Sequence, residues 1–164
     1  MSRMGIGLGY DVHAFVQGRP LVLGGVEVPG DRGLAGHSDA DVLVHALMDA
    51  ILGAMRAGDI GQHFPDTDPA FEGCSSIGLL EKVGAMMRAA GWTLADADTV
   101  LILESPKIAP LRDRMRGVMA EALGVPIERI GLKATTTEGL GATGRGEGVA
   151  AQAVVLLERD ADRA

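Results

Sequence analysis

An aspartate and a histidine stand one residue apart near the start of the chain, in the stretch "GYDVHAF". On an extended strand, residues i and i+2 project from the same face. Asp11 and His13 can therefore both point at one metal ion, while Val12 between them packs inward. Carboxylate oxygen and imidazole nitrogen are both ligands that zinc accepts. The stretch is a candidate for part of a metal site.

A third ligand can come from the stretch "SDADVLVHALMDAILGAM", which predicts a helix with Ser38 as its N-cap. Asp41, His45 and Asp49 lie on one face of that helix, opposite an apolar stripe. One aspartate and two histidines are the kind of ligand set that a catalytic zinc uses, with a fourth position left for water or substrate. Asp49 can then orient an imidazole. The alternative is that the His45 imidazole only makes a hydrogen bond with Asp41 or Asp49 and binds no metal.

The stretch "LKATTTEGLGATGRGEG" combines threonines, Glu138, Arg145 and a loop with five glycines. Hydroxyls, backbone amides and a guanidinium together suit a phosphate. The letters "GLGATG" match the dinucleotide fingerprint, but that motif must open a helix inside a βαβ unit, so we reject it. A P-loop also fails, because Arg145 and Gly146 stand where Lys and Ser or Thr belong. The alternative is a glycine-rich hairpin with an incidental arginine.

Three shorter stretches add candidate residues. "HSDAD" places His37 and Ser38 just before the helix, where amide groups favour an anion, although Ser38 alone can be explained as a cap. "GDIGQHFPDTDP" is dense in turn residues, and its His63 either lines a pocket or covers one. "ESPKI" ends a strand and turns at Pro106, so Lys107 is either a ligand-binding or a surface lysine.

Periodicity predicts the elements that must position these residues. Short apolar runs predict strands at 5–15, 20–28, 99–103, 129–136 and 148–157. Helices are predicted from residue 38, over 76–90 and from Pro110 to Gly124. Strand and helix alternate without a repeat or linker, which predicts one α/β or α+β domain over 1–164. The last strand is apolar at both its odd and its even positions, so both of its faces are apolar, and helices or a subunit interface must cover the second one.

Composition excludes several function classes. Lys plus Arg number 15 against 22 Asp plus Glu, which gives a net charge of −7, and no basic run is present, so we expect no nucleic-acid partner. Cys74 is the single cysteine, which excludes a disulfide framework and fits a reducing cytosol. Neither a signal peptide nor a membrane span is recognisable, so we expect a cytoplasmic protein without membrane association.

Taken together, the stretches resemble the 2-C-methyl-D-erythritol 2,4-cyclodiphosphate synthases of the non-mevalonate isoprenoid pathway. The resemblance spans nearly the whole chain through "GYDVHAF", "GLAGHSDADVLVHALMDAILGA", "GDIGQHFPDTDP", "SPKI" and "KATTTEGLGATGRGEG", in this order. It implies an α+β fold with a mixed four-to-five-stranded sheet, helices packed on one face, and sheets packed together around a trimer axis. It also implies a homotrimer with active sites between subunits.

The resemblance further implies a reaction. A metal-dependent phosphorus-oxygen lyase would cyclise 4-diphosphocytidyl-2-C-methyl-D-erythritol 2-phosphate, the 2-phosphate oxygen attacking the β-phosphorus, with release of CMP. Such chemistry needs positioning and charge neutralisation more than a protein nucleophile. Two other classes stay open. A zinc-dependent phosphohydrolase would use the same ligands, and a non-catalytic trimer would bind an isoprenoid diphosphate.

Residue roles also follow from the resemblance. The resemblance implies that zinc is bound by Asp11, His13 and His45, and that Mg2+ or Mn2+ is bound by Glu138 together with the substrate diphosphate. Catalytic roles fall on His37 and Thr136. The implied substrate-binding residues are Asp11, Val12, His13, His37, Ser38, Asp59, Ile60, Gly61, Phe64, Pro65, Asp66, Thr67, Asp68, Leu103, Pro106, Lys107, Ile108, Ala109, Ala134, Thr135, Thr136, Thr137, Glu138, Ala142 and Arg145.

The chain departs from the family pattern at Ala142, where some members carry an aromatic residue. In the family this region faces a central apolar cavity of the trimer, near Arg145 and Glu147. Whether that cavity binds an isoprenoid diphosphate is therefore open. The chain lacks the fused cytidylyltransferase domain of bifunctional members, so we expect it to catalyse only the cyclisation.

Overall fold

A computed structural model describes residues 3–159, which form a mixed five-stranded sheet in the order β4-β1-β7-β5-β6. β1 pairs antiparallel with β4 and β7, β7 pairs antiparallel with β5, and β5 pairs parallel with β6. The strands are β1 (Arg3–Gln17), β4 (Arg32–Leu34), β5 (Thr93–Ile102), β6 (Ile130–Thr135) and β7 (Gly148–Arg159). This sheet confirms the predicted α+β class.

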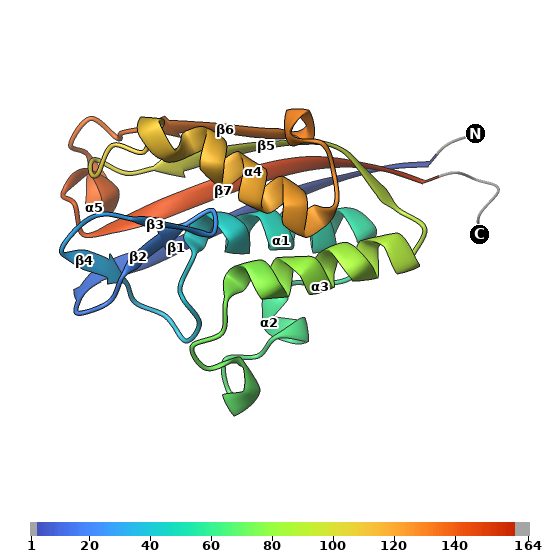
Figure 1. Ribbon diagram of the computed structural model, residues 1–164, viewed down its shortest axis with the longest axis horizontal. Coiled ribbons are helices and arrows are strands. Elements are labelled where there is room, and N and C mark those ends of the chain that lie inside the picture. The colour runs from blue at the N-terminus through green and yellow to red at the C-terminus, as the bar shows by residue number, and fades with distance from the viewer. Residues whose placement is uncertain (1–2, 160–164) are drawn as a thin grey trace.

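Three long helices, α1 (Val42–Met55), α3 (Ser76–Ala89) and α4 (Arg112–Leu123), lie on one face of the sheet (Figure 1). α1 packs on β1 and β7, α3 packs on α1 and α4, and α4 contacts β6. A separate hairpin pairs β2 (Leu21–Leu23) with β3 (Val26–Val28). The short helices are α2 (Ile60–His63), α5 (Gly141–Gly144) and the 3-10 turns η1 (Pro69–Phe71), η2 (Ala109–Leu111) and η3 (Ile127–Arg129).

The face of β1 that meets α1 is made of glycine. A Cβ added at Gly7 would lie 1.8 Å from the carbonyl oxygen of Ala50, and one at Gly9 would lie 1.8 Å from that of Ala46. Gly5 is similarly close to the backbone of Ala54. Glycine at alternate strand positions and alanine on one stripe of the helix thus let the two backbones touch. No bulkier residue fits between them, so the sequence itself sets the distance between α1 and β1.

The opposite face of β1 is apolar and uncovered. Met4, Ile6, Leu8, Tyr10 and Val12 alternate with the glycines and retain between 50% and 69% of their surface exposed. The prediction that Val12 packs inward is therefore wrong, because the strand alternates and the helices cover only the Asp11 and His13 side. Val154 on β7 is also exposed, so helices alone do not cover both faces of the last strand.

Most predicted elements are confirmed, and the deviations lie at their ends. α1 begins at Val42 with Asp41 as its N-cap, so the predicted Ser38 cap is wrong. The buried Asp41 carboxylate accepts from the amides of Val44, Gly24 and Gly25, and burial raises its pKa to about 6 despite these bonds.

Other boundaries and elements differ from the sequence-based expectation. The predicted strand 20–28 is the β2–β3 hairpin, and β5 begins at Thr93 instead of residue 99. The short elements β4, α2, η1, η3 and α5 were not predicted. No helix between residues 3 and 159 combines the length and apolar character that a membrane crossing needs.

The glycine face of β1 gives a first prediction. Gly7→Ala should destabilise the protein by about 3 kcal/mol, because the new methyl group must push the α1 backbone away from the strand. The matched control is Gly53→Ala in α1, where a Cβ meets nothing within 4 Å. That variant should be neutral or stabilised by about 0.5–1 kcal/mol. Urea unfolding monitored by circular dichroism measures both, and equal midpoints for Gly7→Ala and wild type would contradict the argument.

Candidate active site

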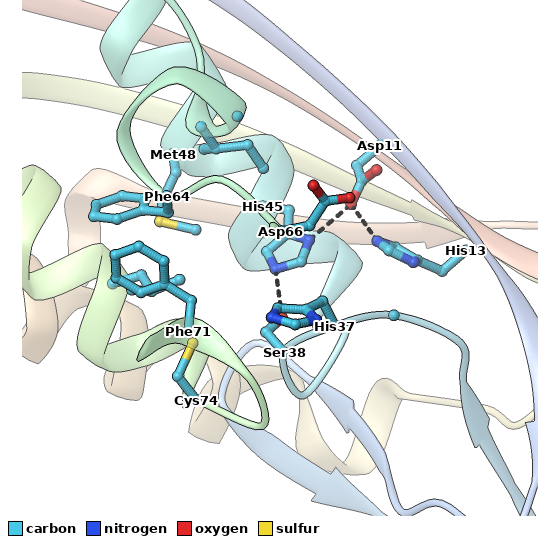
Figure 2. A pocket seen from close by; sticks show the side chains of 14 residues that line it. Asp11, His13, His37, Ser38, His45, Met48, Phe64, Asp66, Phe71 and Cys74 are labelled. Atoms are coloured by element: carbon cyan, nitrogen blue, oxygen red, sulfur yellow. Dashed lines mark hydrogen bonds and ion pairs between the residues drawn. The ribbon is translucent and has the colours of Figure 1, made fainter. Parts of the chain in front are cut away.

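The carboxylate of Asp11 lies between two imidazoles, those of His13 and His45 (Figure 2). Asp11 Oδ2 is 2.9 Å from His13 Nε2 and 3.0 Å from His45 Nδ1. The three ligand atoms lie within 4.8 Å of one another, close enough for one metal ion. β1 supplies Asp11 and His13 from its helix-facing side, and α1 supplies His45. The structure therefore brings together the trio that the sequence predicts.

The charge state of this cluster follows from its hydrogen bonds. Burial of Asp11 favours the protonated carboxyl, but the hydrogen bonds to His13 and His45 outweigh it and hold the pKa of Asp11 well below its usual range. The same hydrogen bond to Asp11 raises the pKa of His13. One carboxylate and two imidazole nitrogens that converge on one point form a donor set that suits zinc.

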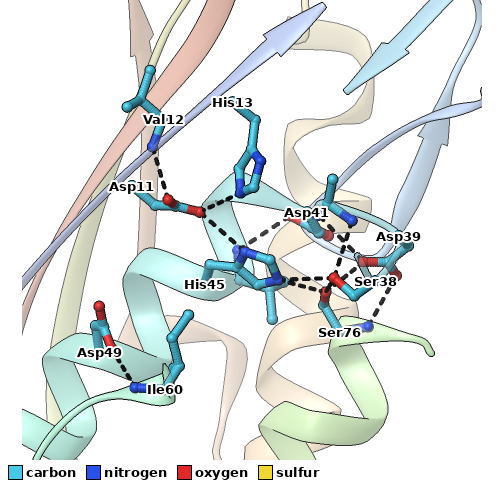
Figure 3. A network of polar contacts seen from close by, with 12 residues as sticks. Asp11, Val12, His13, Ser38, Asp39, Asp41, His45, Asp49, Ile60 and Ser76 are labelled. Atoms are coloured by element: carbon cyan, nitrogen blue, oxygen red, sulfur yellow. Dashed lines mark hydrogen bonds and ion pairs between the residues drawn. The ribbon is translucent and has the colours of Figure 1, made fainter. Parts of the chain in front are cut away.

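Each imidazole is also held on the side away from Asp11. His13 Nδ1 lies 2.5 Å from the carbonyl oxygen of Ala35, and His45 Nε2 lies 3.0 Å from Ser76 Oγ (Figure 3). The prediction that Asp49 orients an imidazole is wrong. Its carboxylate accepts from the backbone amide of Ile60 at 2.8 Å and so fixes the start of α2.

The cluster lies in the wall of a pocket of about 400 Å³. The predicted substrate-binding residues that line it are Asp11, His13, His37, Ser38, Ile60, Gly61, Phe64 and Asp66. Sequence reasoning missed the apolar part of the wall, formed by Met48, Phe71, Cys74 and Leu79. No sequence signal marked these four residues, because isolated apolar residues in helices and turns are usual in a core.

Other predicted substrate residues do not line this pocket. Val12 faces the opposite side of the sheet, and Pro65 and Thr67 lie in the turn after α2. Asp59 caps α2 by accepting from the amide of Gln62, and Asp68 caps the following 3-10 turn. His63 is also absent from the pocket wall, because its Nε2 bonds to the carbonyl oxygen of Ala57 at 2.8 Å.

His37 carries an unsatisfied polar atom. Its Nε2 is buried and finds no hydrogen-bond partner within residues 3–159. Buried polar atoms without a partner are rare in folded proteins, and each costs about 1–3 kcal/mol. Because His37 lines the same pocket as the metal cluster, a bound ligand atom is the natural partner for this nitrogen.

A second pocket, of about 380 Å³, lies where the parallel strands β5 and β6 end. It is lined by Leu103, Pro106, Lys107, Ile108, Ala109, Ala134, Thr135, Thr136 and Glu138, all of them predicted substrate residues. Thr137, Ala142 and Arg145 do not line it, and Arg145 forms an ion pair with Glu147 at 2.5 Å. The two pockets have no lining residue in common.

Glu138 is held in an unusual backbone conformation at the edge of the second pocket. Its φ is 54°, in the left-handed region, which is costly for a residue other than glycine. Thr136 Oγ1 donates to Glu138 Oε1 at 3.1 Å and accepts from the Glu138 amide at 3.3 Å. These two bonds keep the carboxylate beside the hydroxyl of Thr136.

The glycine loop, which contains the short helix α5, joins β6 to β7, and β5 lies between these two strands in the sheet, so the alternative of a glycine-rich hairpin is wrong. The rejection of the dinucleotide fingerprint holds, because α5 spans only Gly141–Gly144 and leads into β7, which runs antiparallel to β5.

Comparison with known proteins identifies the family. A sequence model of the YgbB family matches residues 4–158. The chain belongs to this family. A relative from Syntrophobacter fumaroxidans, named 2-C-methyl-D-erythritol 2,4-cyclodiphosphate synthase, is 59% identical over 157 residues, 96% of this chain and 99% of the relative. The chain is thus an enzyme of isoprenoid biosynthesis, a cyclodiphosphate-forming lyase, and the predicted family and function are confirmed.

Solved structures agree with this assignment. The bifunctional IspDF from Campylobacter jejuni superposes with a TM-score of 0.94 at 42% identity, over 98% of this chain and 43% of that chain. A structure of 2C-methyl-D-erythritol-2,4-cyclodiphosphate synthase in a form with bound CDP superposes with a TM-score of 0.85 at 43% identity, over 93% of this chain and 99% of that chain. The fold is therefore that of the synthases.

Proposed function

We propose that the chain cyclises 4-diphosphocytidyl-2-C-methyl-D-erythritol 2-phosphate through the two pockets described above. A bond forms between a 2-phosphate oxygen and the β-phosphorus, the bond from the β-phosphorus to the bridging oxygen breaks, and CMP leaves with that oxygen. The observation that carries the proposal is the convergence of Asp11, His13 and His45 in a pocket that also contains the unsatisfied Nε2 of His37.

Two metal sites belong to the proposal. Asp11, His13 and His45 would hold zinc, since they offer the three ligands of a catalytic site, and Glu138 would hold Mg2+ or Mn2+ together with the substrate diphosphate. Such ions, when bound, polarise phosphate oxygens and neutralise their charge. The low pKa of Asp11 keeps its carboxylate ready for a cation without loss of a proton.

The remaining steps fall to side chains of the chain itself. His37 Nε2 would bond to a substrate oxygen, which satisfies an atom that the folded chain leaves without a partner. Thr136, held beside Glu138, would place its hydroxyl against the developing charge on the diphosphate. Each group acts by orientation, because a phosphoryl transfer of this kind needs no protein nucleophile.

The second pocket is suited to the cytidine. Apolar side chains of Leu103 and Ile108 offer a surface for the base, and Lys107 offers a cation near a phosphate. Bound CDP in a solved relative supports a nucleotide in this family. Substrate-binding roles stay predictions for Val12, Asp59, Pro65, Thr67, Asp68, Thr137, Ala142 and Arg145. The sequence leaves open whether a central cavity of the trimer binds a ligand.

A homotrimer would join the two pockets into one site. The uncovered face of β1 exposes Ile6, Leu8 and Tyr10 in one row, and contiguous exposed apolar residues of this kind mark interaction surfaces. The metal pocket and the cytidine pocket share no residue within one chain. A neighbouring copy packed on the apolar face can supply the missing half of each site.

We further propose that residues 1–164 form one catalytic domain and work in the cytoplasm.

Phosphorus NMR tests the reaction. Wild-type protein with the cytidylyl substrate, zinc and magnesium should yield a cyclic diphosphate together with CMP. His45→Ala should lose turnover by more than about 100-fold, because the metal loses one of three ligands. His63→Ala is the matched control, since His63 bonds only a backbone carbonyl, and it should keep turnover.

Each alternative class has its own signature in the same spectra. A linear phosphate product would favour a phosphohydrolase. Absence of turnover in a zinc-loaded wild-type protein would favour a binding protein without catalysis. Full turnover by His45→Ala after loss of zinc would overturn the ligand assignment.

The second metal gives a further prediction. Glu138→Gln should raise the magnesium concentration that gives half-maximal turnover by about 10-fold, because a neutral amide binds a hard cation more weakly than a carboxylate. Glu128→Gln, in η3 and exposed, should leave the titration unchanged. A magnesium titration of CMP release measures both variants, and superimposable curves for Glu138→Gln and wild type would refute the role of Glu138.

The trimer is tested through its apolar face. Leu8→Glu places a charge at a position that is 69% exposed in the single chain and buried in the proposed assembly, so it should yield monomers. Ala85→Glu on α3, exposed on the helix side, should leave the mass unchanged. Light scattering after size exclusion measures the mass, and a wild-type monomer or a trimeric Leu8→Glu would contradict the proposal.

A further inference from the structure

Two polar residues, Asp39 and Ser76, lie behind His45, on the side of the ring away from Asp11 (Figure 3). Ser76 is the first residue of α3 and is fully buried, and Asp39 lies in the segment just before α1. Ser76 Oγ donates to Asp39 Oδ1, and Asp39 Oδ2 accepts from the Ser76 backbone amide at 2.9 Å. The predicted site includes neither residue.

The hydrogen count of this group determines where the proton of His45 lies. A serine hydroxyl carries one hydrogen, and an ionised carboxylate only accepts. The hydrogen of Ser76 Oγ is committed to Asp39. Ser76 Oγ must therefore accept from His45 Nε2, which lies 3.0 Å away, and Ser38 Oγ, 3.2 Å from the same nitrogen, is a second acceptor on this side of the ring. The neutral ring carries its proton on Nε2, and Nδ1 is left as a lone pair.

The other ring nitrogen, Nδ1, lies 3.0 Å from Asp11 Oδ2. With the hydrogen of the neutral ring held on Nε2 by Ser76, Nδ1 can exchange its hydrogen bond to Asp11 for a bond to a cation at the same place. We propose that Asp39 and Ser76 are positioning residues, which hold His45 in the Nε2–H tautomer so that Nδ1 is ready for the metal. This inference rests on the metal site proposed above.

His13 is also held by an acceptor behind its ring, but through Nδ1 where His45 uses Nε2. His13 Nδ1 lies 2.5 Å from the carbonyl oxygen of Ala35, which can only accept, so Nδ1 carries the proton and Nε2 faces Asp11. A backbone carbonyl suffices for His13 because Ala35 follows β4, the strand paired with β1. His45 has no such carbonyl behind it among its bonded neighbours, and the serine takes that place. Outer partners of this kind commonly set the tautomer of metal-bound histidines.

The support for Ser76 is rigid. Asp39 N donates to the Cys74 carbonyl at 3.1 Å, and Gly73 N donates to the His37 carbonyl at 2.8 Å, so the two loops are joined through their backbones. Asp39 also satisfies the first amide of α3, whose N-cap Ser75 makes no side-chain cap bond. The carboxylate thus holds the α3 N-terminus and the serine together behind His45.

Zinc affinity tests the proposal with a readout that does not depend on turnover. The dissociation constant is measured by chelator competition on the full chain. Ser76→Ala should weaken zinc binding by about 10–100-fold, because the ring is then free to rotate and to carry its proton on Nδ1. The control is Ser75→Ala, the exposed neighbour without a side-chain bond, which should bind zinc like wild type.

Nitrogen-15 NMR of the histidine rings supplies a second readout. In the metal-free wild type at alkaline pH, where an imidazole is neutral, the His45 proton should reside on Nε2, and Ser76→Thr, which keeps the hydroxyl, should preserve both this signal and the affinity. Should Ser76→Ala fail to fold, Asp39→Asn takes its place with the same expected loss of affinity. Unchanged zinc affinity together with an unchanged His45 signal in either folded variant would overturn the proposal. A wild type that binds no zinc would instead overturn the metal site itself.

Discussion

The contact between the glycine face of β1 and the alanine stripe of α1 is the constraint on which the site depends. Gly7 and Gly9 lie against the backbone of Ala50 and Ala46 with no room for a single methyl group. The next positions on the same face of β1 are Asp11 and His13, and the residue before Ala46 is His45. The metal cluster is therefore the continuation of a tightly packed strand–helix contact, and its distances are fixed by backbone packing.

The same strand has a different task on its other face. Because side chains alternate, the residues between the glycines and the ligands are apolar and point away from the helices. Glycines weaken an isolated strand, but β1 is paired with β7 along nearly its whole length. One strand thus carries Asp11 and His13 on one face and an exposed apolar surface on the other, so the proposed metal site and the proposed contact between copies would depend on a single element.

What the sequence could predict depended on local periodicity. Asp11 and His13 are two residues apart on a strand, and His45 lies on a definite face of a helix, so the trio could be found without a structure. Asp49 shares that face, but periodicity predicts only the side of the helix from which a side chain projects and not how far it lies from His45. The Asp49 carboxylate bonds instead to the backbone amide of Ile60 at the start of α2. Ser38 and Asp41 are both good N-caps, and only the amides of the β2–β3 turn favour Asp41. Ser76 could not be found, because its place behind His45 depends on two loops that pair through their backbones.

The two pockets differ in how far the folded chain prepares them. In the first pocket, the imidazoles of His13 and His45 each have a partner behind the ring, so these two rings are held in place by the folded chain itself. In the second pocket, Glu138 is exposed, and within the described residues Thr136 is the side chain that bonds to it and accompanies its left-handed backbone. A rigid cluster can orient a phosphate only if the rest of the substrate is brought to it. Since the two pockets share no residue, in the proposed trimer their alignment would come from how copies pack on the apolar face of β1, and geometry between chains would then matter to the reaction together with geometry within one chain.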